Sequence, residues 1–436
     1  MLQTDADPAL ATALRRVEQA FAAANPNSER RHRAAATAMP GGNTRTSLYY
    51  SPFPVAFASG QGQRLTDIDN HTYLDFLGEY SAGLYGHSHP AIMAAARHAL
   101  DAGIAFGGPN EHEAELASLI KVRFPAVELL RFTNSGTEAN LMAIATARAI
   151  TGRTHVLVFN GGYHGSVLSF RGASPVNVPF PFVVGAFNDA EGAVSLIDRH
   201  RHELAGVLVE PMLGGAGAIP GTPEFLRALR DATEQAGVLL MFDEVMTSRL
   251  SPGGLQQVHG IRPDITTFGK YLGGGFSFGA FGGAQHLMER YDPGRSGGLA
   301  HPGTFNNNTL TMAAGAAGLR EVFTPEVAVA HNRRGDELRD RLNSLFASKG
   351  VAMQATGIGS IIGIHFRRTP VTAPGDPGPA EPKRALLHLE MMARGFYFAR
   401  RGYLALSVAL EPADHDAFVS ALDEVVTVHA GLLTGE

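Results

Sequence analysis

Lys270 stands after an apolar run and before a run of glycines, in TTFGKYLGGG. Apolar neighbours would strip water from its ammonium group, lower its pKa and make the amine a nucleophile. The glycines would let a flat cofactor approach the backbone. The alternative is a surface lysine beside a flexible loop, and the residue alone favours that alternative. Tyr271 follows in place of Ser or Thr, so the segment is not a phosphate-binding P-loop.

Asp243 ends the apolar run VLLMF, where its carboxylate needs a partner because burying an unpaired charge is costly. A protonated ring nitrogen, a metal ion or an arginine would each serve as that partner. A structural salt bridge is an equally good interpretation of the residue taken alone. Glu244, the next residue, is expected to point to the other face of the strand.

A polar turn before a helix offers a site for a phosphate group. Ser135, Gly136 and Thr137 lie in NSGTEAN, after an apolar run and before a helix expected from Glu138. Free N–H groups and two hydroxyls would bind an anion there, although a simple N-cap is favoured for the triplet alone. Thr304, in the aperiodic segment HPGTFNNN, is a second candidate phosphate donor, with an ordinary loop as its strong alternative.

Tyr163 and Glu210 also follow apolar runs. Tyr163, in GGYHG, has a ring that would stack on a planar group, although loop aromatics are common. Glu210, in VEP, is expected either to fix loop geometry or to take part near a cofactor. His87 and His89 lack a third metal ligand with sensible spacing, so we interpret them as a turn at a helix start.

Two arginines are candidates for holding a substrate carboxylate through a bidentate fork. Arg45 lies in PGGNTRTSLYY and Arg401 in ARRGYLALS. A solvated arginine is the better interpretation of either residue taken alone. Tyr49, Tyr50 and Phe53, which follow Arg45, are candidates for an apolar pocket wall, with plain core packing as an equal alternative.

The elements that must position these residues are indicated by the pattern between residues 87 and 325. Helical stretches alternate there with apolar runs of strand length, at 155–160, 205–212, 238–245 and 264–269. This alternation predicts βαβ units and a mostly parallel sheet, in which ligands bind at the carboxyl ends of the strands. The chemistry-bearing residues are therefore expected to meet at one edge of the sheet.

The flanking segments predict a second, smaller α/β unit. Residues 1–38 are expected to be helical and 39–50 a loop, followed by strands. Beyond residue 325 we expect a helix over 326–349, a strand over 357–366, a loop over 369–382, a helix over 383–394, a short strand over 404–410 and a helix over 412–430. The predicted units are an N-terminal segment packing with the small domain (1–60), a large cofactor-binding domain (61–325) and a small C-terminal domain (326–436).

Composition excludes several classes of function. The chain of 436 residues is 44% hydrophobic and 18% charged, which is typical of a globular protein. The absence of cysteine excludes disulfides, a thiolate nucleophile and cysteine-ligated metals. The net charge of −5, without a run of Lys or Arg, argues against nucleic acid as a partner. With no apolar stretch of spanning length and no signal pattern, we expect a cytoplasmic protein and no membrane partner.

Taken together, these residues are the parts that a pyridoxal-phosphate (PLP) enzyme needs. The chain resembles a class III, or ω-type, aminotransferase of PLP fold type I, related to glutamate-1-semialdehyde aminomutase. NSGTEAN, GGYHG, VEP, FDEVMTSRL, TTFGKYLGGG and GTFNNN…MAAG match in order between about residues 39 and 320. The fold implied is a large domain with a mostly parallel sheet plus a smaller α/β domain.

The resemblance also implies roles for the site residues. Lys270 would join PLP covalently and move a proton between the substrate carbon and the cofactor, and Asp243 would keep the pyridine nitrogen protonated. Tyr163 would pack on the ring, and Glu210 would lie near it. The residues implied for the phosphate are Ser135, Gly136, Thr137 and, from the neighbouring subunit, Thr304. The working unit would then be a homodimer with active sites at its interface.

The MPGGNTR loop and the YFARRGYLALS segment are most similar to those of the β-phenylalanine aminotransferases. This similarity implies that Arg45 binds the carboxylate of a β-amino acid. Arg401 would hold the acceptor's distal carboxylate or swing away for an aromatic side chain, with Arg400 as the competing choice. The implied reaction is a ping-pong exchange between a 3-amino-3-phenylpropanoate-type donor and 2-oxoglutarate or pyruvate.

Three other functions stay open at this point. An aminomutase or racemase on the same cofactor, such as a glutamate-1-semialdehyde 2,1-aminomutase-like isomerase, would need no added 2-oxo acid. A non-catalytic PLP-binding protein would tolerate loss of the lysine, yet Lys270 is present. A dinucleotide-binding dehydrogenase would need G-x-G-x-x-G where this chain has NSGT.

Overall fold

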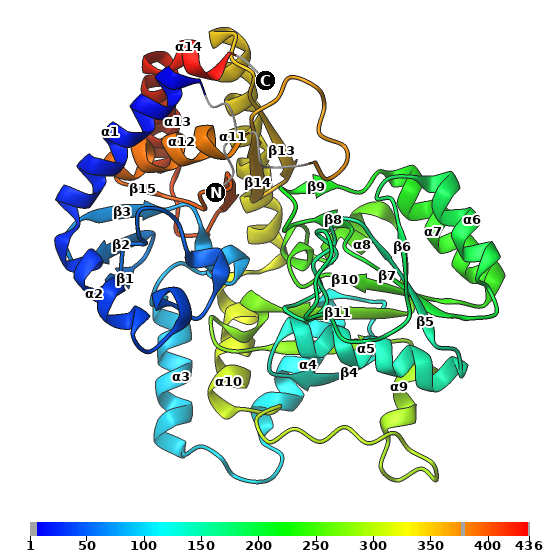
Figure 1. Ribbon diagram of the computed structural model, residues 1–436. Coiled ribbons are helices and arrows are strands. Elements are labelled where there is room, and N and C mark those ends of the chain that lie inside the picture. Colours follow the sequence, from blue (N-terminus) through cyan, green and yellow to red (C-terminus); the bar gives the residue numbers. More distant parts are fainter. Residues whose placement is uncertain (1–6, 376–379, 435–436) are drawn as a thin grey trace.

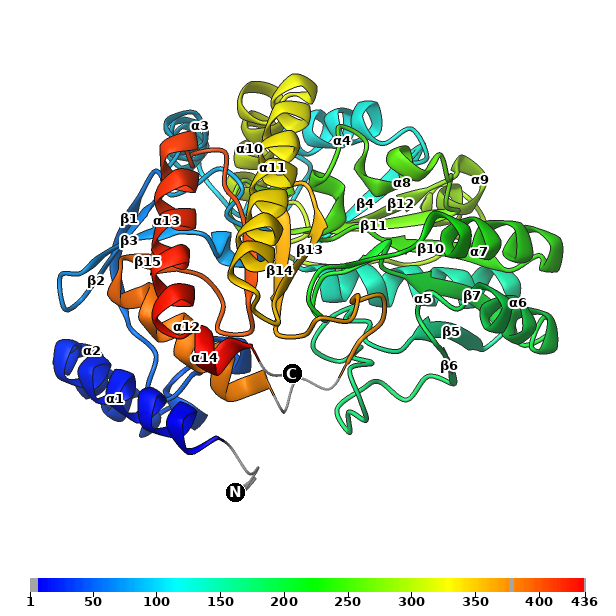
Figure 2. The ribbon, with the colours of Figure 1, turned by 90° about the horizontal axis from the view of Figure 1, so that it is seen from above.

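The computed structural model describes residues 7–375 and 380–434. They form a large lobe around one central sheet and a smaller lobe that contains both ends of the described chain (Figure 1). Helix α11 (Pro325–Lys349) lies between the small-lobe helix α13 (Pro412–Val428) and the central sheet, as the view from above also shows (Figure 2). The expected combination of a large and a smaller α/β unit is therefore observed.

The central sheet has seven strands, and the predicted mostly parallel arrangement is confirmed. In spatial order the strands are β4 (Leu129–Thr133), β12 (Gly279–Gly283), β11 (Ile265–Gly269), β10 (Leu239–Asp243), β7 (Leu204–Val209), β5 (His155–Phe159) and β6 (Phe182–Gly185). Strand β12 is antiparallel to both of its neighbours, and the other pairs are parallel.

Helices cover both faces of this sheet, which explains why its strands are apolar at successive positions. Val156 and Val158 of β5 pack in the cluster that contains α5 (Gly136–Thr151), whereas Leu157 and Phe159 pack in the cluster that contains α6 (Ala190–Arg199) and α7 (Pro223–Ala236). Further helices of the large lobe are α3 (Pro90–Ala102), α4 (Glu111–Arg123), α8 (Gly254–His259), α9 (Gln285–Met288) and α10 (Thr309–Ala317), and a short ribbon joins β8 (Met212–Leu213) to β9 (Ile219–Pro220).

The small lobe contains two further sheets and the terminal helices. Its sheets are β1 (Phe57–Gln61), β2 (Arg64–Asp67), β3 (Thr72–Asp75) and β15 (Phe396–Tyr397), and β13 (Gln354–Ile358), β14 (Ile361–His365) and β16 (Tyr403–Ala405). Besides α11 and α13, its helices are α1 (Pro8–Ala24), α2 (Pro26–Ala36), α12 (Glu381–Ala393) and α14 (Ala430–Leu433). Phe76 and Phe418 stack at 4.4 Å between ring centroids in its core.

The division of the chain into units stays a proposal, and we move its first boundary. Strand β3 pairs in parallel with β15, with Leu74 opposite Phe396. The strands between residues 61 and 75 therefore share a sheet with the C-terminal part of the chain. A boundary after β3 describes this arrangement better than one after residue 60.

Two predicted strands differ from the structure. The strand expected over 357–366 is confirmed for β14, but its first residues belong to the end of β13 and to the turn between the two strands, because the chain reverses at Gly359, whose φ is +54°. The strand expected over 404–410 is limited to Tyr403–Ala405. The helical segment expected over 1–38 consists of α1 and α2, separated at Asn25 before Pro26, and residues 1–6 and 376–379 lie outside the described part. Within the described part, none of the helices has the length and apolarity needed to cross a bilayer.

The contact between α11 and the β13–β14 hairpin leads to a stability prediction. A Cβ atom added to Gly335 would lie 2.1 Å from the carbonyl oxygen of Gly359, so backbone would have to move. We expect Gly335→Ala to destabilise the fold by about 1–3 kcal/mol and to lower the thermal unfolding midpoint measured by calorimetry. Gly431→Ala is the control, because its Cβ would meet no atom within 4 Å. Equal midpoints for the two variants would contradict this packing.

Candidate functional site

Asp243 and Lys270 follow neighbouring strands at the same edge of the central sheet. Strands β10 and β11 are parallel, and Asp243 lies opposite Thr267 in their register. Lys270 comes three residues later, directly after β11, with a φ of +56°. Such a backbone conformation is costly for a residue with a Cβ and is typical of functional sites. The two residues predicted to act on one cofactor are thus brought to adjoining positions.

The Asp243 carboxylate is buried, with 4% of the residue exposed, and is fully hydrogen-bonded on its protein side. Its Oδ2 accepts from Asn140 Nδ2 and from His164 Nδ1, both at 2.8 Å. Its Oδ1 accepts from the Val245 amide at 3.0 Å. Asn140 is oriented in turn by Thr267, whose hydroxyl donates to its Oδ1 at 2.7 Å. Asn140 and His164 lie in the NSGTEAN and GGYHG motifs, but sequence reasoning assigned them no role.

Lys270 has the properties of a usable amine. Its Nζ donates to the Tyr80 carbonyl at 2.9 Å. Burial lowers the pKa of Lys270 to about 8; the carboxylates of Glu79 and Asp243 oppose that shift, and the guanidinium of Arg401 adds to it. This direction agrees with the lowered pKa that the apolar neighbours of Lys270 predict.

The turn that holds Lys270 is one that sequence reasoning missed. Glu79, Tyr80 and Ser81 have φ values of +47°, +53° and +79°, and each such residue costs about 1–3 kcal/mol. The Tyr80 hydroxyl donates to the Ser47 carbonyl at 2.7 Å, which ties this turn to the loop that carries Arg45. The segment GEYSAG contains two glycines but no other sign of this backbone conformation.

The start of α5 has the N-cap expected from the sequence, and its role as an anion site stays a prediction. Ser135 caps the helix through its Oγ, which accepts from the Glu138 amide at 3.2 Å. Among the described residues, the amides of Gly136 and Thr137 have no hydrogen-bond acceptor. A Cβ on Gly136 would lie 2.8 Å from Val245 Cγ2, and this close packing brings the helix start beside the strand ends that carry Asp243 and Lys270. Free amides at a helix start attract phosphate.

Tyr163 and Glu210 are linked through the backbone. One Glu210 oxygen accepts from the Tyr163 amide at 2.8 Å and the other from the Gly214 amide at 2.9 Å. Burial raises the pKa of Glu210 to about 7. Glu210 thus fixes the loop of Tyr163, and its direct contact with a cofactor stays a prediction. The Tyr163 side chain is exposed and available for stacking.

The arginines near the site differ in their partners. Arg45 Nη1 pairs with Glu79 Oε1 at 2.6 Å, and its guanidinium lies 5.9 Å from the centre of the Tyr80 ring. Arg400 pairs with Glu381 at 2.8 Å. Arg401 lies over the Tyr80 ring at 4.8 Å and has no ion pair with any described residue. Of the two choices left open by the sequence, Arg401 is therefore the one available for a substrate.

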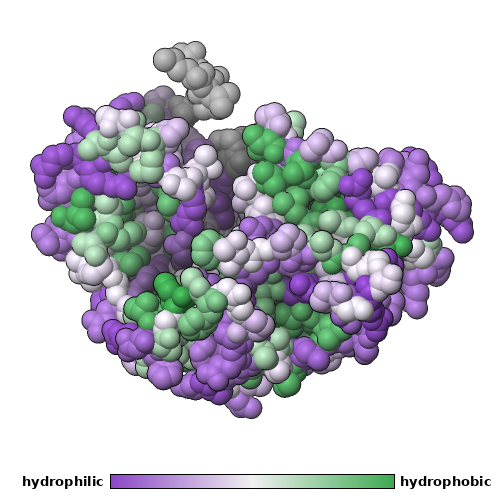
Figure 3. All heavy atoms as spheres, turned by 90° about the horizontal axis from the view of Figure 1, so that it is seen from below, coloured by the Kyte–Doolittle hydropathy of each residue, from purple (hydrophilic) through white to green (hydrophobic). Residues whose placement is uncertain are grey.

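A hollow between the two lobes has mainly hydrophilic walls (Figure 3). One cavity there, of about 240 Å³, is lined by Tyr49, Tyr50, Tyr80 and Arg401 among others. Phe53 belongs instead to the core, where its ring lies 5.3 Å from that of Phe21. The cavity therefore offers an aromatic wall beside a cation.

Thr304 lies on a loop that is joined to the start of α5, because Asn134 Nδ2 donates to Asn306 Oδ1 at 3.1 Å. It is in an exposed turn before α10, and no hydrogen bond of its side chain to a described residue is observed. Its predicted contact with the phosphate of a neighbouring subunit stays a prediction.

The residues at this sheet edge fit PLP. A buried carboxylate whose Oδ1 accepts a single hydrogen bond from the protein suits a protonated ring nitrogen. The free amides at the start of α5 suit the phosphate, and Lys270 suits the aldehyde. Tyr163 is accessible for the ring.

Comparisons with known proteins support the same assignment. The family model described as class-III aminotransferase matches residues 47–389. The chain is 52% identical over 429 residues to the beta-phenylalanine transaminase of Variovorax paradoxus, with 98% of both sequences covered. It is 36% identical over 390 residues to the glutamate-1-semialdehyde 2,1-aminomutase of Desulforudis audaxviator, covering 85% of this chain and 90% of that protein.

Solved structures agree with these sequence matches. The crystal structure of a beta-phenylalanine aminotransferase from Variovorax paradoxus has a TM-score of 0.95 and 51% identity, covering 97% of this chain and 99% of that one. A transaminase with PLP bound has a TM-score of 0.86 and 29% identity, and the match covers 94% of this chain and 99% of that one. The resemblance and fold class inferred from the motifs are confirmed.

The environment of Lys270 predicts its titration. The chain has four lysines, the others being Lys121, Lys349 and Lys383. We expect the Lys270 amine of the cofactor-free protein to be charged below and neutral above a pH of about 8, whereas an ordinary lysine stays charged to about pH 10. The check is an NMR pH titration of protein with ¹³C-methylated amines, with Lys270→Arg to identify the resonance. A midpoint above 10 for Lys270 would contradict its burial.

Proposed function

Because the chain belongs to the class III aminotransferases, we propose that it moves the amino group of an aromatic β-amino acid to a 2-oxo acid. The donor is of the 3-amino-3-phenylpropanoate type, the acceptor is 2-oxoglutarate or pyruvate, and the two substrates react in turn by a ping-pong mechanism. The chain is a transaminase, and its proposed cofactor is PLP. The observation that carries the proposal is the placement of Asp243 and Lys270 at the ends of neighbouring strands, in a chain so similar to a beta-phenylalanine transaminase.

PLP, when bound, supplies an aldehyde that exchanges amines and a ring that stabilises negative charge at the reacting carbon. Asp243 holds the proton on the ring nitrogen, and Asn140 and His164 hold Asp243 in place. Ser135 and the amides of Gly136 and Thr137 hold the phosphate end.

Lys270 is the group that moves protons. With a pKa of about 8, its Nζ is partly neutral near neutral pH and is able to take a proton from the substrate carbon that bears the amine. The Tyr80 carbonyl orients Nζ when it is not joined to the cofactor. Because the same amine returns the proton, Lys270 serves both halves of the exchange.

Substrate recognition is assigned to the arginines and the aromatic wall. Arg45 binds the carboxylate of the β-amino acid. This carboxylate replaces the exposed Glu79, which pairs with Arg45 in the absence of substrate. The cavity beside Tyr49 and Tyr80 takes the aromatic ring of the donor. Arg401, which rests on the Tyr80 ring, holds a carboxylate when the acceptor enters.

We also propose a homodimer in the cytoplasm, in which Thr304 reaches the phosphate bound by the partner. Its neighbour Phe305 is 61% exposed, and Phe106 on an adjacent loop is 54% exposed. The two loops are joined by Asn307, whose Nδ2 donates to the Gly108 carbonyl at 3.1 Å. Apolar side chains presented together in this way support an interface with a second copy.

The requirement for an acceptor separates a transaminase from an isomerase. We expect 3-amino-3-phenylpropanoate to be converted only when 2-oxoglutarate or pyruvate is added, with one amino acid formed per β-amino acid consumed. Chromatographic quantification of both products checks this balance. Rearranged product formed without any 2-oxo acid would favour the aminomutase-like alternative. The chain's similarity to the Desulforudis audaxviator aminomutase is the reason to test for it.

Removal of the proposed carboxylate clamp is expected to weaken donor binding. Arg45→Ala removes a charge-assisted contact and leaves Glu79 to repel the carboxylate, so KM for the β-amino acid should rise about tenfold or more. Steady-state kinetics with a carboxylate-free aromatic amine provide the comparison, for which the rise should be small. Glu79→Gln is the matched control and should not raise KM. Equal effects on both donors would remove the clamp role from Arg45.

A further inference from the structure

Two guanidinium groups near the site lack the partners that neighbouring arginines have. Arg45 is paired with Glu79 and Arg400 with Glu381. In contrast, the guanidinium groups of Arg171 and Arg401 make no hydrogen bond or ion pair with residues 7–375 or 380–434. Arg401 even has a buried Nε without an acceptor. Unpaired cations at a cavity indicate that an anion is bound there.

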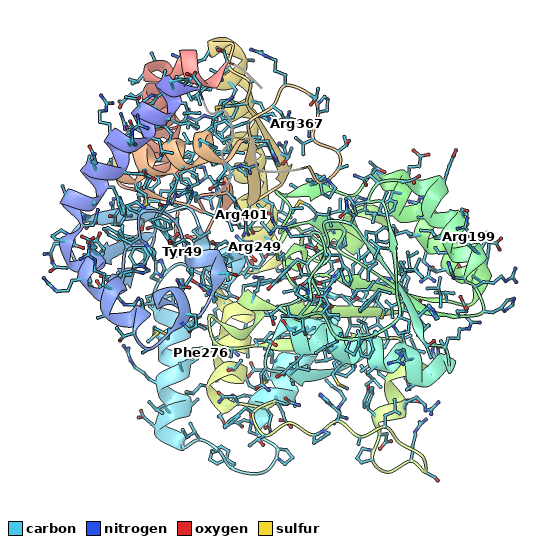
Figure 4. All side chains as sticks on the ribbon, viewed as in Figure 1. Tyr49, Arg199, Arg249, Phe276, Arg367 and Arg401 are labelled. Atoms are coloured by element: carbon cyan, nitrogen blue, oxygen red, sulfur yellow. The ribbon has the colours of Figure 1, made fainter. Side chains whose placement is uncertain are left out.

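Arg171 and Arg401 line the same two cavities. One is the cavity of about 240 Å³ beside Tyr80, and the other has about 650 Å³. The larger cavity is also lined by Arg367 and Arg384. Figure 4 shows Arg401 and Arg367 along the gap between the two lobes. The acid that both cavities share is Glu381, which is already engaged by Arg400. The described wall of the larger cavity is therefore strongly positive.

The positive charges on this cavity wall affect one another. Arg171 is exposed on the cavity wall, yet protein atoms surround its guanidinium. This desolvation, followed by the charge of Arg401, lowers the pKa of Arg171. Like charges held near one another destabilise the protein until an anion offsets them.

The two arginines also adjoin the residues proposed to hold the cofactor. A Cβ on Gly215 would lie 3.3 Å from Tyr163 Cβ and 3.7 Å from Arg171 Cδ, so the Arg171 side chain passes beside the ring-stacking tyrosine. Arg401 rests on Tyr80, whose carbonyl accepts from Lys270 Nζ. An anion held beside Arg401 would lie near the reacting amine, because the charge of Arg401 acts on Lys270.

We propose that Arg171 acts with Arg401 to bind the distal carboxylate of a dicarboxylic 2-oxo acid, which makes Arg171 a specificity-determining residue for the amino acceptor. The inference rests on the proposed function and extends it, because it selects dicarboxylic over monocarboxylic acceptors. A monocarboxylate such as pyruvate carries no second charge for this pair. Two arginine forks hold a carboxylate more firmly than one, and the aromatic donor has no distal carboxylate to occupy them.

The first test compares acceptors in Arg171→Gln. The ratio of kcat/KM for 2-oxoglutarate to that for pyruvate should fall about tenfold or more, because a charged hydrogen bond to the distal carboxylate is lost. Arg199→Gln is the matched control: Arg199 is an exposed arginine at the far side of the large lobe in Figure 4, and its ratio should not change. An unchanged ratio in Arg171→Gln overturns the inference.

The second test does not depend on turnover. Glutarate, a dicarboxylate without a reacting carbonyl, should bind the PLP-loaded protein more tightly than butanoate in isothermal titration calorimetry, and Arg171→Gln should remove most of that preference. Equal glutarate affinities in the wild type and Arg171→Gln overturn the inference. If the enzyme fails to use β-amino acids but glutarate binding still depends on Arg171, the proposed donor is wrong and the carboxylate site stands.

Discussion

A buried carboxylate at the end of a strand is the constraint on which the rest of the site depends. Asp243 accepts three hydrogen bonds from the protein, one of them from His164, and a cationic partner would further stabilise its buried charge. The parallel pairing of β10 with β11 then fixes Lys270 beside it. The start of α5 is held against the same strand ends by glycine-to-valine packing at Gly136. One cofactor bound across these groups satisfies all of them.

The residues that sequence reasoning found are those whose role follows from local pattern. Asp243 and Lys270 follow apolar runs, and the carboxyl ends of parallel strands meet at one edge. Ser135 precedes the first residue of a predicted helix, so its place as the N-cap could be predicted without knowing whether it binds a phosphate. The parallel core of the sheet was predicted for the same reason, since its strands are apolar on both faces.

The residues and elements that were missed depend on contacts between distant segments. Strand β12 is GAFGG, a sequence with little strand propensity that is held by pairing with β4 and β11. Tyr80 acts through its backbone carbonyl, which no side-chain pattern reveals. Arg171 stands out only because its guanidinium forms no ion pair with a described acid, although Glu210 is close enough to act on its charge. The choice of Arg401 over Arg400 likewise depended on the ion pair between Arg400 and Glu381.

The proposed chemistry depends on a covalent bond between PLP and Lys270, one of the four lysines of the chain. The most direct measurement is to load the protein with PLP, reduce it with borohydride, digest it and locate the added mass by peptide mass spectrometry. We expect one pyridoxyl group per chain, on the peptide that contains Lys270. A label on Lys121, Lys349 or Lys383, or no label at all, would contradict it.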